Sequence, residues 1–203
     1  MALTVTLLGG ESSGKTTLAQ ALRPVLQAQG IACTLVPELL RTWCERHGRA
    51  PQAHEQADRA QAQSLAIASA AQDATAQVVL ADTTALVIAA YSELYFEDRS
   101  LWPGAIEQQR RYGLSLLMGL DLPWVPDGLF RDSPAVREAT DALLRRRLAE
   151  AGIGYQTVYG QGESRVRQAL RAIGNALGQP LLPDDAGLTE GNGRWNCESC
   201  SDP

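Results

Sequence analysis

The chain has 203 residues, of which 45% are hydrophobic and 20% are charged, a composition typical of a soluble globular protein. This length suits one domain or at most two, and no apolar run reaches the roughly 18 residues needed to cross a membrane. The formal net charge is −5 without any block rich in lysine or arginine, which disfavours a nucleic-acid partner because such binding needs concentrated positive charge.

The first predicted element is a buried strand at about Leu3–Leu8. The N-terminal sequence MALTVTLLGG lacks the basic region and the cleavage site of a secretory signal. We therefore expect a cytoplasmic protein, in which Cys33 and Cys44 are reduced thiols in the core or near the surface.

A phosphate-binding pattern follows this strand. Residues Gly9–Thr16 read GGESSGKT and fit G-x-x-x-x-G-K-[ST], with a helix predicted near Lys15–Gln29. In such a P-loop the backbone N–H groups and the helix dipole face phosphate oxygens. Lys15 is expected to bridge the β- and γ-phosphates of ATP, and the hydroxyl of Thr16 to ligate Mg²⁺. The expected nucleotide-binding residues are Gly10, Glu11, Ser12, Ser13, Gly14, Lys15, Thr16 and Thr17.

The second predicted strand, Ala32–Val36, is followed by Glu38 and Arg41 in a predicted helix, Glu38–Arg46. The carboxyl ends of parallel strands face the ligand crevice of an open sheet. Glu38 is therefore a candidate to orient or deprotonate an acceptor hydroxyl, and Arg41 to steady substrate or phosphate. The alternative is a glutamate favoured by the helix dipole beside a surface arginine.

A long helix is predicted at His54–Ala74 and a third strand at Gln77–Ala81. Asp82 closes that strand and is expected to hold Mg²⁺ or a water molecule bound to it. The alternative role is that of a helix N-cap, because Asp82 precedes a helix predicted at Thr84–Glu93.

Seven of the eleven aromatic residues lie between Tyr91 and Phe130, around a predicted helix at Ala105–Arg111 and a strand at Leu114–Met118. Aromatic rings stack well on a flat or cationic acceptor. Tyr91, Tyr95 and Trp124 are therefore candidates for acceptor binding, with core packing as the alternative.

The turn-rich segment 126–134 leads into a helix predicted at Ala135–Glu150. Arg131 and Arg137 are placed to reach the transferring phosphoryl group if this segment is a lid, and Arg131 is the preferred candidate. The alternative is an ordinary surface loop.

A last strand, Gln156–Tyr159, and a last helix, Ser164–Leu177, complete a domain predicted to span residues 1–178. The remainder, 179–203, is rich in proline and glycine and is expected to be an irregular tail. Its Cys197 and Cys200 form a C-x-x-C pair, for which an unliganded tail, zinc shared with another chain and redox chemistry remain open.

Apolar strands that alternate with helices predict a three-layer α/β domain. The expected fold is a P-loop NTPase of the nucleoside- or nucleotide-kinase type, with a five-stranded, mainly parallel sheet and a helical lid. No Asn-Lys-x-Asp motif occurs, which argues against a GTPase. A small-molecule kinase is the leading interpretation, and a regulatory ATPase that acts through a protein partner is the alternative.

The sequence resembles the ribosylnicotinamide kinase domain of NadR-type proteins from about Leu3 to Leu177. The resemblance rests on GGESSGKTT, on Glu38 with Arg41, on Asp82-Thr83, and on the segment WVPDGLFR that begins at Trp124. It implies transfer of phosphate from ATP, with Mg²⁺, to nicotinamide riboside or a similar acceptor. It also implies that Asp82 assists at the metal or contacts the ribose of the substrate, and that Asp127 and Arg131 belong to the lid.

One departure concerns the acceptor. The family often carries an aromatic residue immediately before the post-strand glutamate, where this chain has Pro37. The acceptor's identity therefore stays open, as does homo-oligomer formation.

Overall fold

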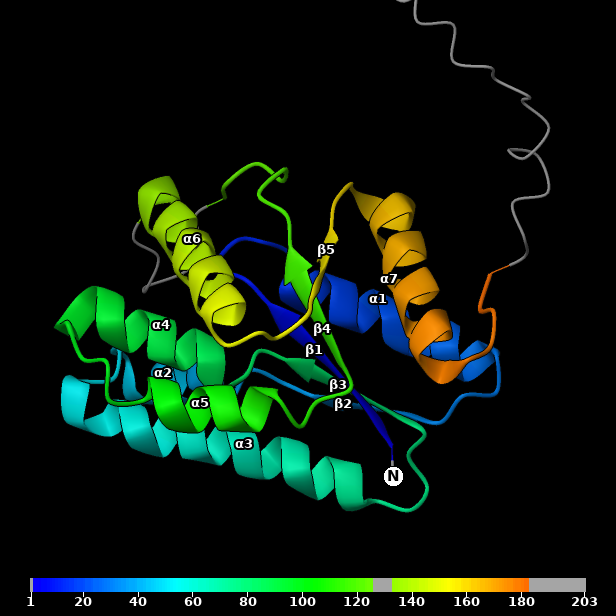
Figure 1. Ribbon diagram of the computed structural model, residues 1–203, viewed down its shortest axis with the longest axis horizontal. Coiled ribbons are helices and arrows are strands. Elements are labelled where there is room, and N and C mark those ends of the chain that lie inside the picture. The colour runs from blue at the N-terminus through cyan, green and yellow to red at the C-terminus, as the bar shows by residue number, and fades with distance from the viewer. Residues whose placement is uncertain (1, 126–132, 183–203) are drawn as a thin grey trace, which may run out of the picture.

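The computed structural model describes residues 2–125 and 133–182 (Figure 1). Within them, one parallel sheet has the strand order β2-β3-β1-β4-β5. Its strands are β1 (Leu3–Leu8), β2 (Cys33–Val36), β3 (Val78–Asp82), β4 (Leu114–Met118) and β5 (Gln156–Val158). All four strand pairings are parallel, so the predicted three-layer fold with a five-stranded sheet is confirmed.

Helices connect the strands at nearly the predicted positions. They are α1 (Lys15–Ala28), α2 (Leu39–His47), a short 3₁₀ helix η1 (Ala53–Glu55), α3 (Gln56–Gln72), α4 (Ala85–Phe96), α5 (Trp102–Gln109), α6 (Pro134–Glu150) and α7 (Gly162–Leu177). The largest differences are in α4, which ends three residues later than predicted, and in α5, which starts three residues earlier. Trp102 opens that helix with Pro103 in its first turn, a position that proline tolerates because the first N–H groups of a helix have no partner inside it.

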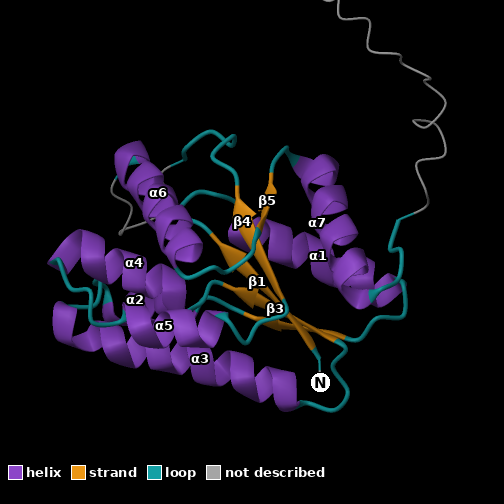
Figure 2. Cartoon of the chain, viewed as in Figure 1, coloured by secondary structure: helices purple, strands orange, loops and turns teal. Residues whose placement is uncertain are grey.

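Helices cover both faces of the sheet (Figure 2). Helices α1 and α7 pack on one face, and α3, α4, α5 and α6 gather on the other. The strands show why both faces must be covered. Val5 and Leu7 enter the core cluster on the α1 side, whereas their neighbour Leu8 joins the cluster on the α4 side. Consecutive apolar residues therefore bury on opposite faces, as expected of a parallel sheet with two helical layers.

The strand register brings the predicted site residues to one edge of the sheet. Leu7 pairs with Asp82 across β1 and β3, and Val36 pairs with Ala81 across β2 and β3. The P-loop, Asp82 and Glu38 thus follow the carboxyl ends of three adjacent strands, although the sequence separates them widely.

Three predictions lie outside the described residues: Asp127 and Arg131 in the expected lid, and the C-x-x-C pair Cys197 and Cys200. Cys33 and Cys44 are both buried free thiols. Over residues 2–125 and 133–182, no helix has the length and apolar character required to cross a membrane.

Candidate functional site

The P-loop joins β1 to α1, and its glycines allow a backbone conformation and a close contact that a side chain would hinder. Gly14, the N-cap of α1, has φ of 81°, which is a left-handed conformation that costs glycine little. A Cβ atom at Gly10 would lie 3.2 Å from the backbone of Arg137. The loop is therefore pressed closely against α6, and the absence of a side chain at Gly10 allows that approach.

Lys15 lies inside this loop. Its side chain is buried, and Nζ donates to the carbonyl oxygens of Gly9 and Gly10, each at 2.9 Å. The ammonium group is thus held over the concave side of the loop by weak, neutral acceptors. A phosphate oxygen would be a stronger, charge-assisted partner for the same donor.

Two arginines, one from α6 and one from α7, donate hydrogen bonds to the backbone of the P-loop. Arg137 of α6 donates to the carbonyls of Ser12 at 3.4 Å and Leu122 at 2.9 Å. Arg165 of α7 donates to the carbonyls of Ser13 at 3.0 Å and Gly119 at 3.2 Å. Both guanidinium groups are thereby committed to backbone carbonyls, so they fix the loop relative to the loop after β4.

Arg165 is not among the residues predicted from the sequence. It is 4% exposed, and burial lowers its pKa, an effect that the charge of Asp121 opposes. An arginine in an amphipathic helix gives no sequence signal for such contacts, because most of its partners are backbone carbonyls and its one side-chain partner, Asp121 at 3.4 Å, is 44 positions away in the sequence. Arg137, in contrast, is one of the two arginines predicted to reach the transferring phosphoryl group, and its Nη1 donates to the carbonyls of Ser12 and Leu122.

Asp82 lies beside the first turn of α1. Its Oδ2 accepts a hydrogen bond from Thr16 Oγ1 at 2.6 Å. The cap of α4 is Thr84, whose side chain accepts from the N–H of Leu86. The capping alternative for Asp82 is therefore excluded, and its carboxylate faces the P-loop.

The donor set around Thr16 fits Mg²⁺. Asp82 is 2% exposed, and its second oxygen, Oδ1, has no hydrogen-bond partner in the described structure. A buried carboxylate oxygen without a partner is costly, and hard oxygen ligands are what Mg²⁺ prefers. Thr16 and Asp82 are accordingly the residues that would hold the ion, together with phosphate oxygens.

The residue after Asp82 is strained. Thr83 has φ of +82°, which is unfavourable for a β-branched side chain. Thr83 is 1% exposed, and its Oγ1 has no partner within the described residues. Such backbone strain persists only where surrounding contacts enforce it, and it gathers at functional sites.

Glu38 and Arg41 lie at the start of α2, shortly after the end of β2. Glu38 is the N-cap residue of α2, yet its side chain makes no capping bond. Arg41 Nε lies 3.7 Å from Glu38 Oε2. Burial raises the pKa of the Cys44 thiol to about 11, and the charges of Glu38 and Glu11 add to the rise. Glu38 and the P-loop residue Glu11 therefore both lie close enough to this buried thiol to act on its charge.

The aromatic candidates separate into two groups. Trp124 is half-buried beside Val125, whose backbone N–H donates to Ser12 Oγ at 2.9 Å and whose carbonyl accepts from it at 3.1 Å. Trp124 therefore borders the P-loop. Tyr91 is buried in the α4 core, with its ring 6.1 Å from that of Tyr95, which is 44% exposed.

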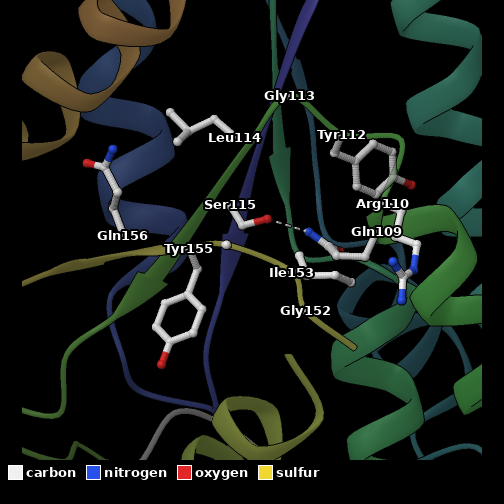
Figure 3. A pocket seen from close by; sticks show the side chains of 11 residues that line it. Gln109, Arg110, Tyr112, Gly113, Leu114, Ser115, Gly152, Ile153, Tyr155 and Gln156 are labelled. Atoms are coloured by element: carbon white, nitrogen blue, oxygen red, sulfur yellow. Dashed lines mark hydrogen bonds between the residues drawn. The ribbon is translucent and has the colours of Figure 1, made fainter. Parts of the chain in front are cut away.

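A cavity of about 620 Å³ lies away from this site (Figure 3). It is lined by Gly113 and Leu114 at the start of β4 and by Tyr155 and Gln156 at the start of β5. These are the amino ends of the strands, whereas the P-loop follows a carboxyl end. The cavity is therefore separate from the phosphate-binding edge, and the candidate site is defined by the P-loop contacts.

Comparison with known proteins gives a family match and similar solved structures. A family model described as an AAA domain matches residues 4–165, which run from β1 into α7. Among curated proteins none matches the chain.

Two solved structures share the fold. A NadR protein in complex with NR superposes with a TM-score of 0.73 and 25% identity, covering 87% of this chain and 52% of the other. A NadR protein in complex with NAD and AMP-PNP superposes with a TM-score of 0.69 and 24% identity, covering 87% and 50%. The chain thus spans about half the length of these solved structures.

Proposed function

The chain belongs to the AAA domain family, and from that membership and the NadR-like fold we propose that it transfers the γ-phosphate of ATP to nicotinamide riboside, forming nicotinamide mononucleotide. The observation that carries the proposal is the convergence of Lys15, Thr16, Asp82 and Glu38 on one edge of the sheet, from the ends of β1, β3 and β2. Phosphate transfer to a hydroxyl requires a loop that binds ATP and a nearby carboxylate that can orient the hydroxyl. Glu38 makes no capping hydrogen bond and is the carboxylate proposed for this role.

Each residue has a separate task in this proposal. The P-loop N–H groups and Lys15 hold the β- and γ-phosphates, and Lys15 offsets the charge that spreads over the γ-oxygens during transfer. Thr16 and Asp82 hold Mg²⁺, which when bound neutralises phosphate charge. Glu38 orients the acceptor hydroxyl and accepts its proton as the phosphoryl group leaves ATP. Arg41, at 3.7 Å from Glu38, steadies the acceptor or the phosphate.

The acceptor ring is assigned to the region of Trp124. Its neighbour Val125 is hydrogen-bonded through its backbone to Ser12 of the P-loop, and a Trp face attracts a cationic ring such as the pyridinium of nicotinamide riboside. Pro37, which precedes Glu38, cannot stack in this way as an aromatic residue would. Tyr95 and Tyr91 remain secondary candidates.

The test is acceptor-dependent ADP release from ATP and Mg²⁺, with nicotinamide riboside, other nucleosides and no acceptor run in parallel. The proposal expects turnover with nicotinamide riboside and a labelled mononucleotide product. Turnover with another nucleoside alone would retain the kinase and change its substrate. Slow ATP hydrolysis that no nucleoside accelerates would instead support a regulatory ATPase. In every case Lys15→Ala should abolish turnover. Turnover that persisted in this variant would come from a contaminating kinase.

A further inference from the structure

Gln63 is a buried polar residue in the middle of α3 with 0% of its surface exposed. Its Oε1 accepts from the backbone N–H of Leu39 at 3.0 Å, and its Nε2 donates to the carbonyls of Pro37 at 3.2 Å and Thr83 at 3.4 Å. Both Nε2 hydrogens and the amide oxygen can thus be used at once. One side chain therefore joins the segment after β2 to the segment after β3.

The two segments are those that carry the proposed catalytic carboxylates. Pro37 and Leu39 are the neighbours of Glu38 on either side, and Thr83 directly follows Asp82. Gln63 therefore holds the backbone on both sides of Glu38 and ties it to the residue next to Asp82. The hydrogen bonds act on backbone groups, so they set where Glu38 lies without contacting its carboxylate.

Gln63 also takes the place of a side-chain cap at the start of α2. An N-cap side chain usually accepts a hydrogen bond from the first turn of its own helix, but Glu38 makes no such bond. Gln63 accepts from Leu39, the first residue of α2, in its place. The N-terminus of α2 thus gains a partner from α3, and the carboxylate of Glu38, which lies 3.7 Å from Arg41, is not used as its cap.

The strained turn at Thr83 gives a reason for the third bond. With φ of +82°, Thr83 occupies a conformation that needs outside contacts to persist. Its carbonyl is held by Gln63, so the same amide group restrains the turn that directs Asp82 toward Thr16. Loss of the amide would release both segments together.

We infer that Gln63 is a positioning residue for phosphate transfer, which holds Glu38 in register with Asp82. This inference rests on the proposed kinase function. It concerns a residue that contacts neither substrate nor metal and acts only through the two segments it joins.

The test compares Gln63→Met, which keeps an unbranched side chain of similar size but removes the amide, with Gln61→Met on the exposed side of the same helix. We expect Gln63→Met to lower kcat with the acceptor by about 10–100-fold, because small displacements of catalytic groups have effects of this size. The KM for ATP should stay within about twofold, since the P-loop is not touched. Gln61→Met should match the wild type. Equal kcat in Gln63→Met and Gln61→Met would overturn the inference.

A double-mutant cycle separates positioning from a general loss of stability. If Gln63 acts through Glu38, adding Gln63→Met to Glu38→Gln should reduce kcat by less than about twofold more, because the group being positioned is already lost. If the reductions in kcat caused by the two single substitutions multiply in the double variant, Gln63 only supports the fold.

A second measurement keeps the inference testable if no acceptor is found. Amide hydrogen exchange at Leu39 should quicken by at least about tenfold in Gln63→Met and remain unchanged in Gln61→Met, because the N–H loses its acceptor. Absence of acceptor-dependent turnover in the wild type would refute the kinase proposal alone. Unchanged exchange at Leu39 would refute the role of Gln63, whatever the activity.

Discussion

Glu38 is the residue at which the kinase and the regulatory ATPase differ most. Glu38→Gln keeps the size of the side chain and removes its charge, so kcat with the acceptor should fall by roughly 10²–10⁴-fold, the usual range for loss of a general base. Affinity for ATP should change little, because the P-loop binds the phosphates independently. The measurement is steady-state turnover together with ATP binding, and Glu45→Gln, an exposed carboxylate on the same helix, is the control.

An unchanged kcat in Glu38→Gln would move the base elsewhere, with Asp82 as the candidate. A loss limited to basal ATP hydrolysis, with no acceptor effect, would favour the regulatory ATPase. The two outcomes are distinguishable in one set of assays with and without acceptor.

Asp82 is expected to act through the metal. Asp82→Asn replaces a carboxylate with a neutral amide, which is a poor ligand for a hard cation, so Mg²⁺-dependent turnover should fall far more than binding of ATP without metal. Titration of Mg²⁺ against activity, and of ATP in the presence of a chelator, measures the two effects. Asp58→Asn on the exposed face of α3 is the matched control, and equal losses with and without metal would contradict the assignment.

Residues such as Gln63 and Arg165 mark the limit of what the sequence could predict about the site. The P-loop, Glu38 and Asp82 follow strand ends, so their positions along the chain are enough to name them as candidates. Gln63 and Arg165 function by bonding to backbone carbonyls of distant segments. Any buried amide or guanidinium group could make such bonds. The sequence of a helix therefore does not show which of its glutamines or arginines makes them.

At the scale of secondary-structure elements, Gln109 joins α5 to the sheet and to α4. Its Nε2 donates to Thr6 Oγ1 at 2.8 Å and to Ser115 Oγ at 2.9 Å, and its Oε1 accepts from Thr84 Oγ1 at 2.9 Å. Thr84 is the N-cap of α4. The start of the helix that follows Asp82 is therefore held by a buried polar network between β1, β4 and α5.

Removal of this amide should destabilise the domain. Gln109→Met would leave three buried hydroxyl groups with fewer partners, at a cost of roughly 1–3 kcal/mol in the free energy of unfolding. Urea denaturation measures the change, and Gln108→Met, at the neighbouring half-buried position, is the control. A change of less than about 0.5 kcal/mol would mean that the hydroxyls find other partners.

Helices α4, α5 and α6 meet at Glu93, which is 9% exposed. Its carboxylate accepts from Trp102 Nε1 at 2.7 Å and from Arg147 Nη2 at 2.9 Å, and it lies 2.9 Å from Arg99. Burial raises the pKa of Glu93, but the hydrogen bonds from Arg147 and Trp102 and the charges of Arg147 and Arg99 outweigh it, so the pKa lies below its ordinary value.

This lowered pKa predicts a loss of stability in acid. Stability from Glu93 is fully present above the ordinary glutamate pKa of about 4.3 and is lost as pH falls through the lower folded-state value. Glu93→Gln should therefore reduce the free energy of unfolding by roughly 1–3 kcal/mol at pH 7, and its difference from the wild type should shrink below about pH 4. Denaturation between pH 7 and pH 3 measures this.

The control for Glu93 is Glu107→Gln, which removes an exposed pair with Arg111 and should change stability by less than about 1 kcal/mol at any pH. A difference between Glu93→Gln and the wild type that stays constant down to pH 3 would mean that the charge of Glu93 contributes nothing.

For the whole molecule, nucleotide binding should stabilise the entire domain. The P-loop is fixed to α6 and α7 by Arg137 and Arg165, so a ligand there contacts a surface that exists only in the folded chain. ATP with Mg²⁺ at about 100 times its Kd should add about 2.7 kcal/mol to the free energy of unfolding. Thermal unfolding with and without nucleotide measures the shift, and Lys15→Ala should lose most of it.

The architecture was predictable because it depends on patterns that extend over many residues. Leu3–Leu8 and Leu114–Met118 are continuous apolar runs, and the structure has strands at those positions. Strand order was not part of the prediction. In the structure the central strand β1 is hydrogen-bonded to β3 and β4, and because these bonds join backbone groups, the side chains do not identify the partner strand. The location of the acceptor also stays a prediction. An aromatic-rich segment names Tyr91, Tyr95 and Trp124 as candidates, but tertiary packing decides which of these rings are buried and which are accessible to a ligand.

The central position of β1 has a consequence for how the chain folds. Its partners β3 and β4 are reached only after long intervening segments, so these pairings close large loops and form slowly compared with local helices. The P-loop needs β1 seated between those partners, and Asp82 needs β3 beside β1. A chain emerging from the ribosome would therefore gain its capacity to bind nucleotide as a late, single event, and nucleotide affinity during refolding would report completion of the sheet.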